Sequence, residues 1–148
     1  MSSDFVPSEF PVPTELAGPG FTLRPLAPEH NAQDYAAWTS SAEHIAATPG
    51  FEGRSWPRPM TPEDNLGDLR QHAEDFAQRQ GFTYTVMEDT GDVVGCVYLY
   101  PSNDPGFDVD ARSWVRADRA HLDVALYRLV SQWLADAWPF TTVAYAPR

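Results

Sequence analysis

One stretch of the chain combines an apolar strand, a charged turn and the start of a long amphipathic helix. It reads Ser113-Trp114-Val115-Arg116-Ala117-Asp118-Arg119-Ala120-His121-Leu122-Asp123. The first N–H groups of a helix have no partner within that helix, so a helix that follows a strand directly offers hydrogen-bond donors to an anion. If this protein carries out chemistry, we expect it at this turn.

Two interpretations of the charges in this turn are open. Arg116 and Arg119 can make charge-assisted hydrogen bonds to phosphate groups. Alternatively, the arginines neutralise nearby aspartates in a solvated cluster. Asp118 is placed to cap the helix, which is worth roughly 0.5–2 kcal/mol, and a capping carboxylate competes with a phosphate for the same donors. His121 is the best single candidate for a proton acceptor, and a surface histidine is its structural alternative.

The elements that position this turn follow from hydrophobic periodicity and from turn residues. Thr61, Pro62 and Asp64 form the start signal of a helix, and Gly81 is a suitable C-terminal residue for it. The helices predicted from these signals cover 31–40, 61–81 and 119–138, with a further short piece at 41–47. The predicted strands cover 21–26, 82–88, 93–100, 109–116 and 140–145.

The domain organisation is simple. Residues 1–20 contain four prolines and no apolar period, which predicts a flexible Pro-rich N-terminal arm, mobile unless something pins it. Residues 21–148 are the length of a single domain. The predicted last strand, 140–145, forms a sheet edge that the arm or a partner subunit is expected to cover, so we predict a homodimer.

The element order β-α-α-β-β-β-α-β over residues 21–146 resembles the GNAT family of N-acetyltransferases. In that family a strand leads into a helix through Q/R-x-x-G-x-G/A, and the turn binds acetyl-CoA. In this chain the glycine positions fall on His121 and Asp123, or on Arg119 and His121 if Arg116 takes the first place, so the cofactor motif is degenerate. The resemblance implies an α+β fold with a mixed, mostly antiparallel sheet flanked by helices.

The resemblance also implies site residues. Acetyl-CoA is expected at Trp114, Val115, Arg116, Arg119, Ala120 and His121. Candidate catalytic residues are His121, Glu88 as a base toward an amine, and Tyr145, with Tyr98 and Tyr100 as further tyrosines able to protonate a departing thiolate. The acceptor pocket is expected at Trp38, Arg54, Trp56 and Tyr98. For these residues the alternatives are a solvated hairpin acid for Glu88, buried aromatic residues for the tyrosines and core packing for Trp38.

Composition excludes several function classes. The net charge is −11. Residues 1–106 contain sixteen acids and five arginines, while 107–148 contain five of each, so all the excess negative charge lies in the first part. This field disfavours nucleic acid and acidic membranes and favours a partner that carries an amine. The chain has no lysine, which excludes Schiff-base chemistry, and Cys96 is its only cysteine, expected as a small core residue. His30, His44 and His72 are isolated, so no metal site is predicted.

No apolar run is long enough to span a bilayer and no targeting segment is evident, so we expect a cytoplasmic protein. The leading hypothesis is a GNAT-like N-acetyltransferase that transfers an acetyl group from acetyl-CoA to a small-molecule or peptide amine. The alternative is a degenerate GNAT-fold protein that does not use acetyl-CoA. It would bind a ligand or a protein, or catalyse another reaction in the same cleft.

Overall fold

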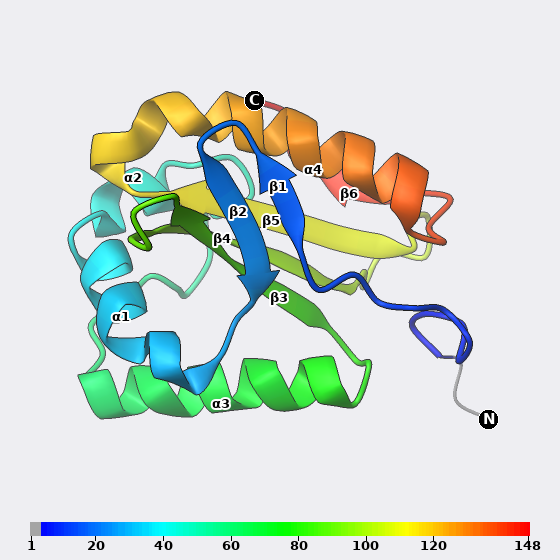
Figure 1. The fold of residues 1–148 in the computed structure, drawn as a ribbon, viewed down its shortest axis with the longest axis horizontal. Helices are drawn as coiled ribbons and strands as arrows, with labels where there is room; N and C mark the ends of the chain where they lie inside the picture. Colours follow the sequence, from blue (N-terminus) through cyan, green and yellow to red (C-terminus); the bar gives the residue numbers. More distant parts are fainter. Residues whose placement is uncertain (1–3) are drawn as a thin grey trace.

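In a computed structural model, which describes residues 4–148, a six-stranded sheet lies between two helical layers (Figure 1). The strands are arranged in sequence order: β1 (Leu16–Gly18), β2 (Phe21–Pro25), β3 (Phe82–Glu88), β4 (Val93–Pro101), β5 (Val109–Val115) and β6 (Val143–Tyr145). Neighbouring strands are antiparallel except β5 and β6, which are parallel. The predicted mixed, mostly antiparallel α+β fold is confirmed.

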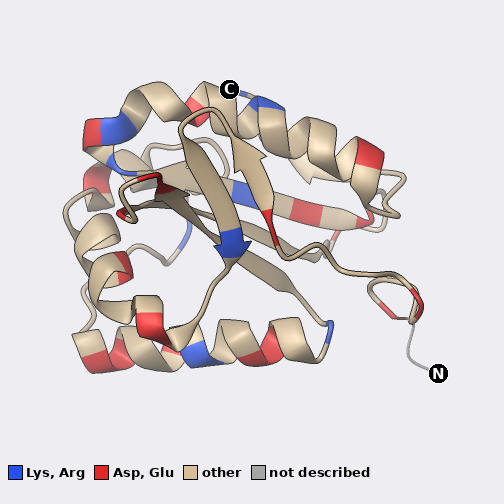
Figure 2. Cartoon of the chain, viewed as in Figure 1, with Lys and Arg blue, Asp and Glu red and all other residues tan. Residues whose placement is uncertain are grey.

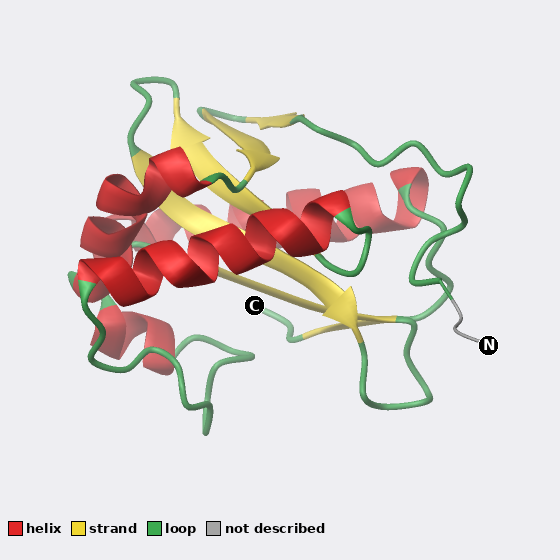
Figure 3. Cartoon of the chain, turned by 90° about the horizontal axis from the view of Figure 1, so that it is seen from below, coloured by secondary structure: helices red, strands yellow, loops and turns green. Residues whose placement is uncertain are grey.

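The helices cover both faces of the sheet (Figures 1 and 3). One face, which we call the α3 face, packs against α1 (Asn31–Thr39) and α3 (Pro62–Ala77), with the short η1 (Pro28–His30) and α2 (Ala42–Ala46) nearby. The other, the α4 face, packs against α4 (Asp123–Ala137). Because side chains alternate along a strand, each face has its own core.

The predicted start of α3 is confirmed in atomic detail. Thr61 Oγ1 accepts a hydrogen bond from the Asp64 N–H at 3.1 Å, and Asp64 Oδ2 accepts from the Thr61 N–H at 3.3 Å. The predicted end of this helix is wrong. The helix stops at Ala77, and Arg79 rather than Gly81 adopts the left-handed conformation, with φ of 59°.

Gly81 is required for a different reason. A Cβ atom at this position would lie 2.2 Å from a carbon of the Tyr100 ring, so the ring rests directly on the glycine backbone. A close approach of this kind needs a residue without a side chain.

The two cores differ in character. On the α4 face, Leu126, Val130 and Leu134 of α4 are buried in an apolar cluster. On the α3 face, large aromatic side chains pack with Cys96, whose side chain is fully buried, as expected for a core residue. Burial raises the pKa of the Cys96 thiol well above its usual value, which keeps the thiol neutral.

The N-terminal arm predicted over 1–20 is described from residue 4 onward, and residues 4–20 pack along the body of the domain, while 1–3 lie outside the described residues. Val6 is buried, and β1 pairs with β2 through Leu16 and Leu23. Arg79 donates hydrogen bonds to the carbonyl oxygens of Pro7 at 2.6 Å and Phe10 at 2.9 Å. The segment is held in place because its apolar residues, though not periodic in the sequence, pack individually into the core. It covers the β2 edge of the sheet and leaves β6 at the opposite edge.

The strand-to-helix turn also differs from its prediction. Residues 117–122 form a 3-10 helix, η2 (Ala117–Leu122), and α4 begins at Asp123 rather than at 119. The last strand is shorter than predicted, at 143–145. Figure 2 shows acidic residues concentrated along α3, whose sequence contains five acids and one arginine. Within residues 4–148, no helix is long and apolar enough to cross a membrane.

Candidate functional site

A cavity of about 530 Å³ opens on the α3 face of the sheet. Its floor comes from β4 and β5, its sides from α1 and α3, and its rim from the loop 49–60. The register pairs Tyr98 with Arg112 and Tyr100 with Asp110, and alternation along the strands directs all four side chains to this face. The two strands therefore supply four polar side chains to the lining of the cavity.

An aromatic wall forms one side of this pocket. The Trp56 ring centroid lies 5.4 Å from that of Trp38, 5.9 Å from Phe51 and 6.5 Å from Tyr98. Three of the four predicted substrate residues, Arg54, Trp56 and Tyr98, line the pocket. The fourth, Trp38, lies behind Trp56 with 2% of its surface exposed, so it supports the wall rather than forming it.

A buried polar network borders the same pocket. The Asn65 side-chain amide donates to Asp34 Oδ2 at 3.0 Å, and Asn65 Oδ1 accepts from Trp38 Nε1 at 3.0 Å. Burial raises the pKa of Asp34 to about 6, against the opposing effect of the Asn65 hydrogen bond. Asp34 therefore offers a carboxyl group in an aromatic pocket, an arrangement that suits an ammonium group.

A second polar group on the pocket wall joins α3 to β4. His72 Nδ1 lies 2.8 Å from Tyr100 Oη, which donates to Asp75 Oδ2 at 2.8 Å. His72, which has no neighbour at metal-ligand spacing in the sequence, therefore has hydrogen-bond partners in the fold. The three-residue spacing of His72 and Asp75 on a helix was the available signal, because it places both residues on one face.

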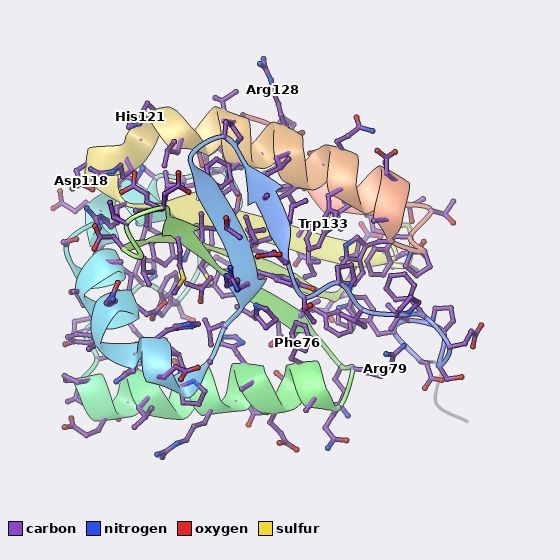
Figure 4. The ribbon with its side chains drawn as sticks, viewed as in Figure 1. Phe76, Arg79, Asp118, His121, Arg128 and Trp133 are labelled. Carbon is purple, nitrogen blue, oxygen red and sulfur yellow. The ribbon has the colours of Figure 1, made fainter. Side chains whose placement is uncertain are left out.

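The three predicted catalytic residues lie in different surroundings. His121 is exposed on η2. Figure 4 shows both His121 and Asp118 on the outer side of the turn. Glu88 accepts a hydrogen bond from Arg119 Nε at 2.9 Å. Tyr145 Oη lies 2.5 Å from Ser113 Oγ, and burial raises its pKa to about 12. Among the hydrogen bonds of residues 4–148, none connects His121, Glu88 and Tyr145 to one another.

The arginines of the turn are paired with carboxylates. Arg116 Nη2 lies 2.8 Å from Asp118 Oδ2, and Arg119 Nε lies 2.9 Å from Glu88 Oε2. The prediction that Asp118 caps the helix is wrong, because its carboxylate bonds to Arg116 and makes no capping hydrogen bond. The hydrogen bond from Arg116 lowers the pKa of Asp118, so this carboxyl is ionised at neutral pH.

The remaining predicted cofactor residues divide into buried and exposed ones. Trp114 and Val115 are buried, and Trp114 Nε1 donates to Tyr98 Oη at 3.0 Å, so only their backbone can face a ligand. Ala120 is exposed on η2. No group of three or more His, Cys, Asp or Glu side chains suited to a metal ion occurs among the described residues.

Arg148 occupies the space where β5 and β6 separate. β6 pairs with β5 only as far as Ala111 and Tyr145, and beyond this point the Arg148 guanidinium donates to the Ser113 carbonyl at 2.7 Å. It also lies 2.6 Å from Asp123 Oδ2 and donates to the Pro49 carbonyl at 3.2 Å. The Arg148 side chain is 3% exposed. It therefore connects β5, the start of α4 and the loop beside the pocket.

A match to a family model identifies this fold as an acetyltransferase domain. The family model described as acetyltransferase (GNAT) domain matches residues 21–143, and the chain belongs to this family. The strand-turn-helix, the sheet from β2 to β5 and α1–α3 all lie within the matched residues.

Solved structures of acetyltransferases share the fold. The ribosomal-protein-S5-alanine acetyltransferase from Vibrio fischeri is 15% identical, with a TM-score of 0.64 over 83% of this chain and 68% of its own. Mycobacterium smegmatis RimJ, in complex with CoA-disulfide, is 15% identical, with a TM-score of 0.62 over 83% of this chain and 61% of its own.

The microcin C7 self-immunity acetyltransferase MccE, in complex with acetyl-CoA and AMP, is 13% identical. Its TM-score is 0.56 over 80% of this chain and 66% of its own. The chain thus spans about two thirds of the length of these proteins. No curated protein sequence matches it.

Proposed function

We propose that this protein transfers an acetyl group from acetyl-CoA to an amine of a small molecule or peptide that enters the pocket on the α3 face. The observation that carries the proposal is the pocket itself, with its aromatic wall and the buried Asp34, in a chain of the GNAT family. A carboxyl group beside aromatic rings attracts an ammonium group and orients it. The chain's excess of acids favours the same kind of acceptor.

Support for acetyl-CoA at the turn 116–122 comes from the two guanidinium groups of Arg116 and Arg119. Ala117 and Ala120 are exposed beside them, and the Ala117 N–H already donates to Ser41 Oγ at 2.8 Å. To hold phosphates, each guanidinium exchanges a carboxylate partner for a phosphate oxygen. When bound, acetyl-CoA supplies the thioester carbonyl that the amine attacks.

A calorimetric titration of acetyl-CoA tests the cofactor assignment. We expect binding by the wild type and a loss of about 10- to 100-fold for Arg116→Ala or Arg119→Ala, since a hydrogen bond to a charged group contributes roughly 1.5–3 kcal/mol. Asp118→Asn removes the competing charge and should tighten binding. Arg128→Ala, on the exposed side of α4 (Figure 4), is the matched control and should bind like the wild type.

The alternative function keeps the pocket and gives up the cofactor. It is favoured by the carboxylate pairing of Arg116 and Arg119 and by Arg148, which fills the space between β5 and β6. If acetyl-CoA gives no heat up to near-millimolar concentration while an aromatic amine such as tryptamine binds, the protein is a binding module of the GNAT fold. A homodimer and a cytoplasmic location stay predictions, and light scattering at high concentration tests the dimer.

A further inference from the structure

The hydrogen bonds around Tyr100 fix the proton positions in the His72 group. A tyrosine hydroxyl has one proton, and Tyr100 donates it to Asp75 Oδ2 at 2.8 Å. Burial, with the hydrogen bond to Asp75, raises the pKa of Tyr100, so the phenol stays protonated. Its oxygen is then an acceptor toward His72 Nδ1 at 2.8 Å, and Nδ1 must carry the imidazole proton.

A neutral imidazole protonated at Nδ1 has its lone pair on Nε2. His72 lines the pocket, and within residues 4–148 its hydrogen bonds to Tyr100 and Thr83 both involve Nδ1. Nε2 is therefore the free basic atom of this ring. Burial lowers the pKa of His72 against the opposing charges of Asp68 and Asp75, so the neutral form prevails at pH 7.

The position of Tyr100 is set by backbone as well as by hydrogen bonds. Its ring rests on Gly81, where a Cβ would come within 2.6 Å of three ring carbons. The Tyr100 ring also packs against the His72 ring, with centroids 6.0 Å apart. The histidine is thus supported from two elements, α3 and β4, that are fixed by the sheet core.

We propose that His72 is the general base that takes a proton from the acceptor amine, and that Tyr100 and Asp75 are positioning residues that hold its tautomer. The inference rests on the proposed acetyl transfer. The amine nitrogen bonds to the acetyl carbonyl carbon as the carbon–sulfur bond breaks. Of the two protons that the ammonium group gives up, one goes to His72 Nε2 and later to solvent, and the other goes to the departing sulfur.

The tautomer is tested without any ligand. A long-range 1H–15N spectrum of the histidine side chains, with His72 assigned through His72→Gln, reports which ring nitrogen carries the proton. We expect the Nδ1–H form in the wild type. In Tyr100→Phe the Thr83 hydroxyl is the remaining partner of Nδ1, and it can donate, so the Nε2–H form should increase. An Nε2–H tautomer in the wild type overturns the proposal.

The activity test uses acetyl-CoA with tryptamine and measures thiol release over pH 5–9. His72→Gln should lose about 100-fold or more in kcat, the usual contribution of a general base. Tyr100→Phe and Asp75→Asn should lower kcat with little change in KM and move the acid limb of the profile. His44→Gln, on α2 and outside the pocket, should behave like the wild type.

The acid limb belongs to His72 if it disappears in His72→Gln. The titratable groups that adjoin this ring are Asp68 and Asp75 from α3 and Tyr98 and Tyr100 from β4. Retention of both rate and acid limb in His72→Gln overturns the proposal. The proposed acetyl transfer is refuted instead if the wild type binds acetyl-CoA but releases no thiol with tryptamine or with a short peptide. The base role of His72 then falls with it, while the tautomer spectrum still decides whether Tyr100 positions the ring.

Discussion

Replacing Arg148 by leucine should destabilise the protein far more than replacing an exposed arginine such as Arg128. The Arg148 side chain is 3% exposed, and its guanidinium bonds Asp123 Oδ2 at 2.6 Å and the Ser113 carbonyl at 2.7 Å. Asp123 Oδ1 is already buried without a partner among the described residues. In Arg148→Leu neither oxygen of this carboxylate has a partner, and the Ser113 carbonyl loses its donor.

The magnitude follows from that burial. Breaking a buried ion pair costs about 3–5 kcal/mol, and the lower end applies because the Asp123 side chain remains 19% exposed. For a chain of this length a loss of about 3 kcal/mol lowers Tm by roughly 6–12 °C. Thermal and urea unfolding both measure it.

A double-mutant cycle assigns the loss to the pair. Adding Asp123→Asn to Arg148→Leu removes the orphaned charge and should recover more than about 1 kcal/mol, because residues in direct contact are not additive. Arg128 is an exposed arginine of α4, and Arg128→Leu should change stability by about 0.5 kcal/mol or less. A loss below about 1 kcal/mol in Arg148→Leu would refute the reasoning.

Three further changes test other parts of the fold. The pKa of Asp34 is raised to about 6, so the folded state holds this proton more tightly than the unfolded chain does. Compared with Asp34→Asn, the wild type should therefore lose roughly 2–3 kcal/mol of its free energy of unfolding as pH rises from about 4 to about 6.5, measured by urea titration. Thr61→Ala removes the α3 cap and should cost about 1 kcal/mol in the same assay, whereas Thr61→Ser should cost little. Val6→Ala removes buried methyl groups from the N-terminal segment and should cost about 1 kcal/mol or more, whereas a free arm would show no change.

Local patterns in the sequence sufficed for most of the elements. The capping residues Thr61 and Asp64 and the apolar, β-branched runs of β3 and β4 act within a few residues, so they can be identified without the fold. The start of α4 could not be identified in this way. Asp118 has the side chain of a helix cap, but Arg116 provides a stronger partner for it, and the chain forms a 3-10 turn before α4 begins.

The site was predictable in part. Trp56 stands out because a tryptophan between serine and proline in a loop has no local reason to be there, and it forms the pocket wall. The network around Asp34, His72 and Tyr100 could not be predicted, apart from the helical spacing of His72 and Asp75, because it depends on contacts across 25 or more residues, such as the bond of Tyr100 to Asp75. The packing of the N-terminal segment could not be predicted for the same reason, since Val6 is buried by residues far along the chain.

Because the aromatic wall contains tryptophan, intrinsic fluorescence can report on the pocket. The five tryptophans of the chain are divided between the two cores: Trp38, Trp56 and Trp114 belong to the cluster beside the pocket, and Trp133 and Trp138 belong to the α4 face. A molecule that enters the pocket meets the indole of Trp56 and changes its emission, while the distant pair emits as before. Intrinsic fluorescence therefore separates occupancy of the pocket, which alters part of the signal, from unfolding, which alters all of it.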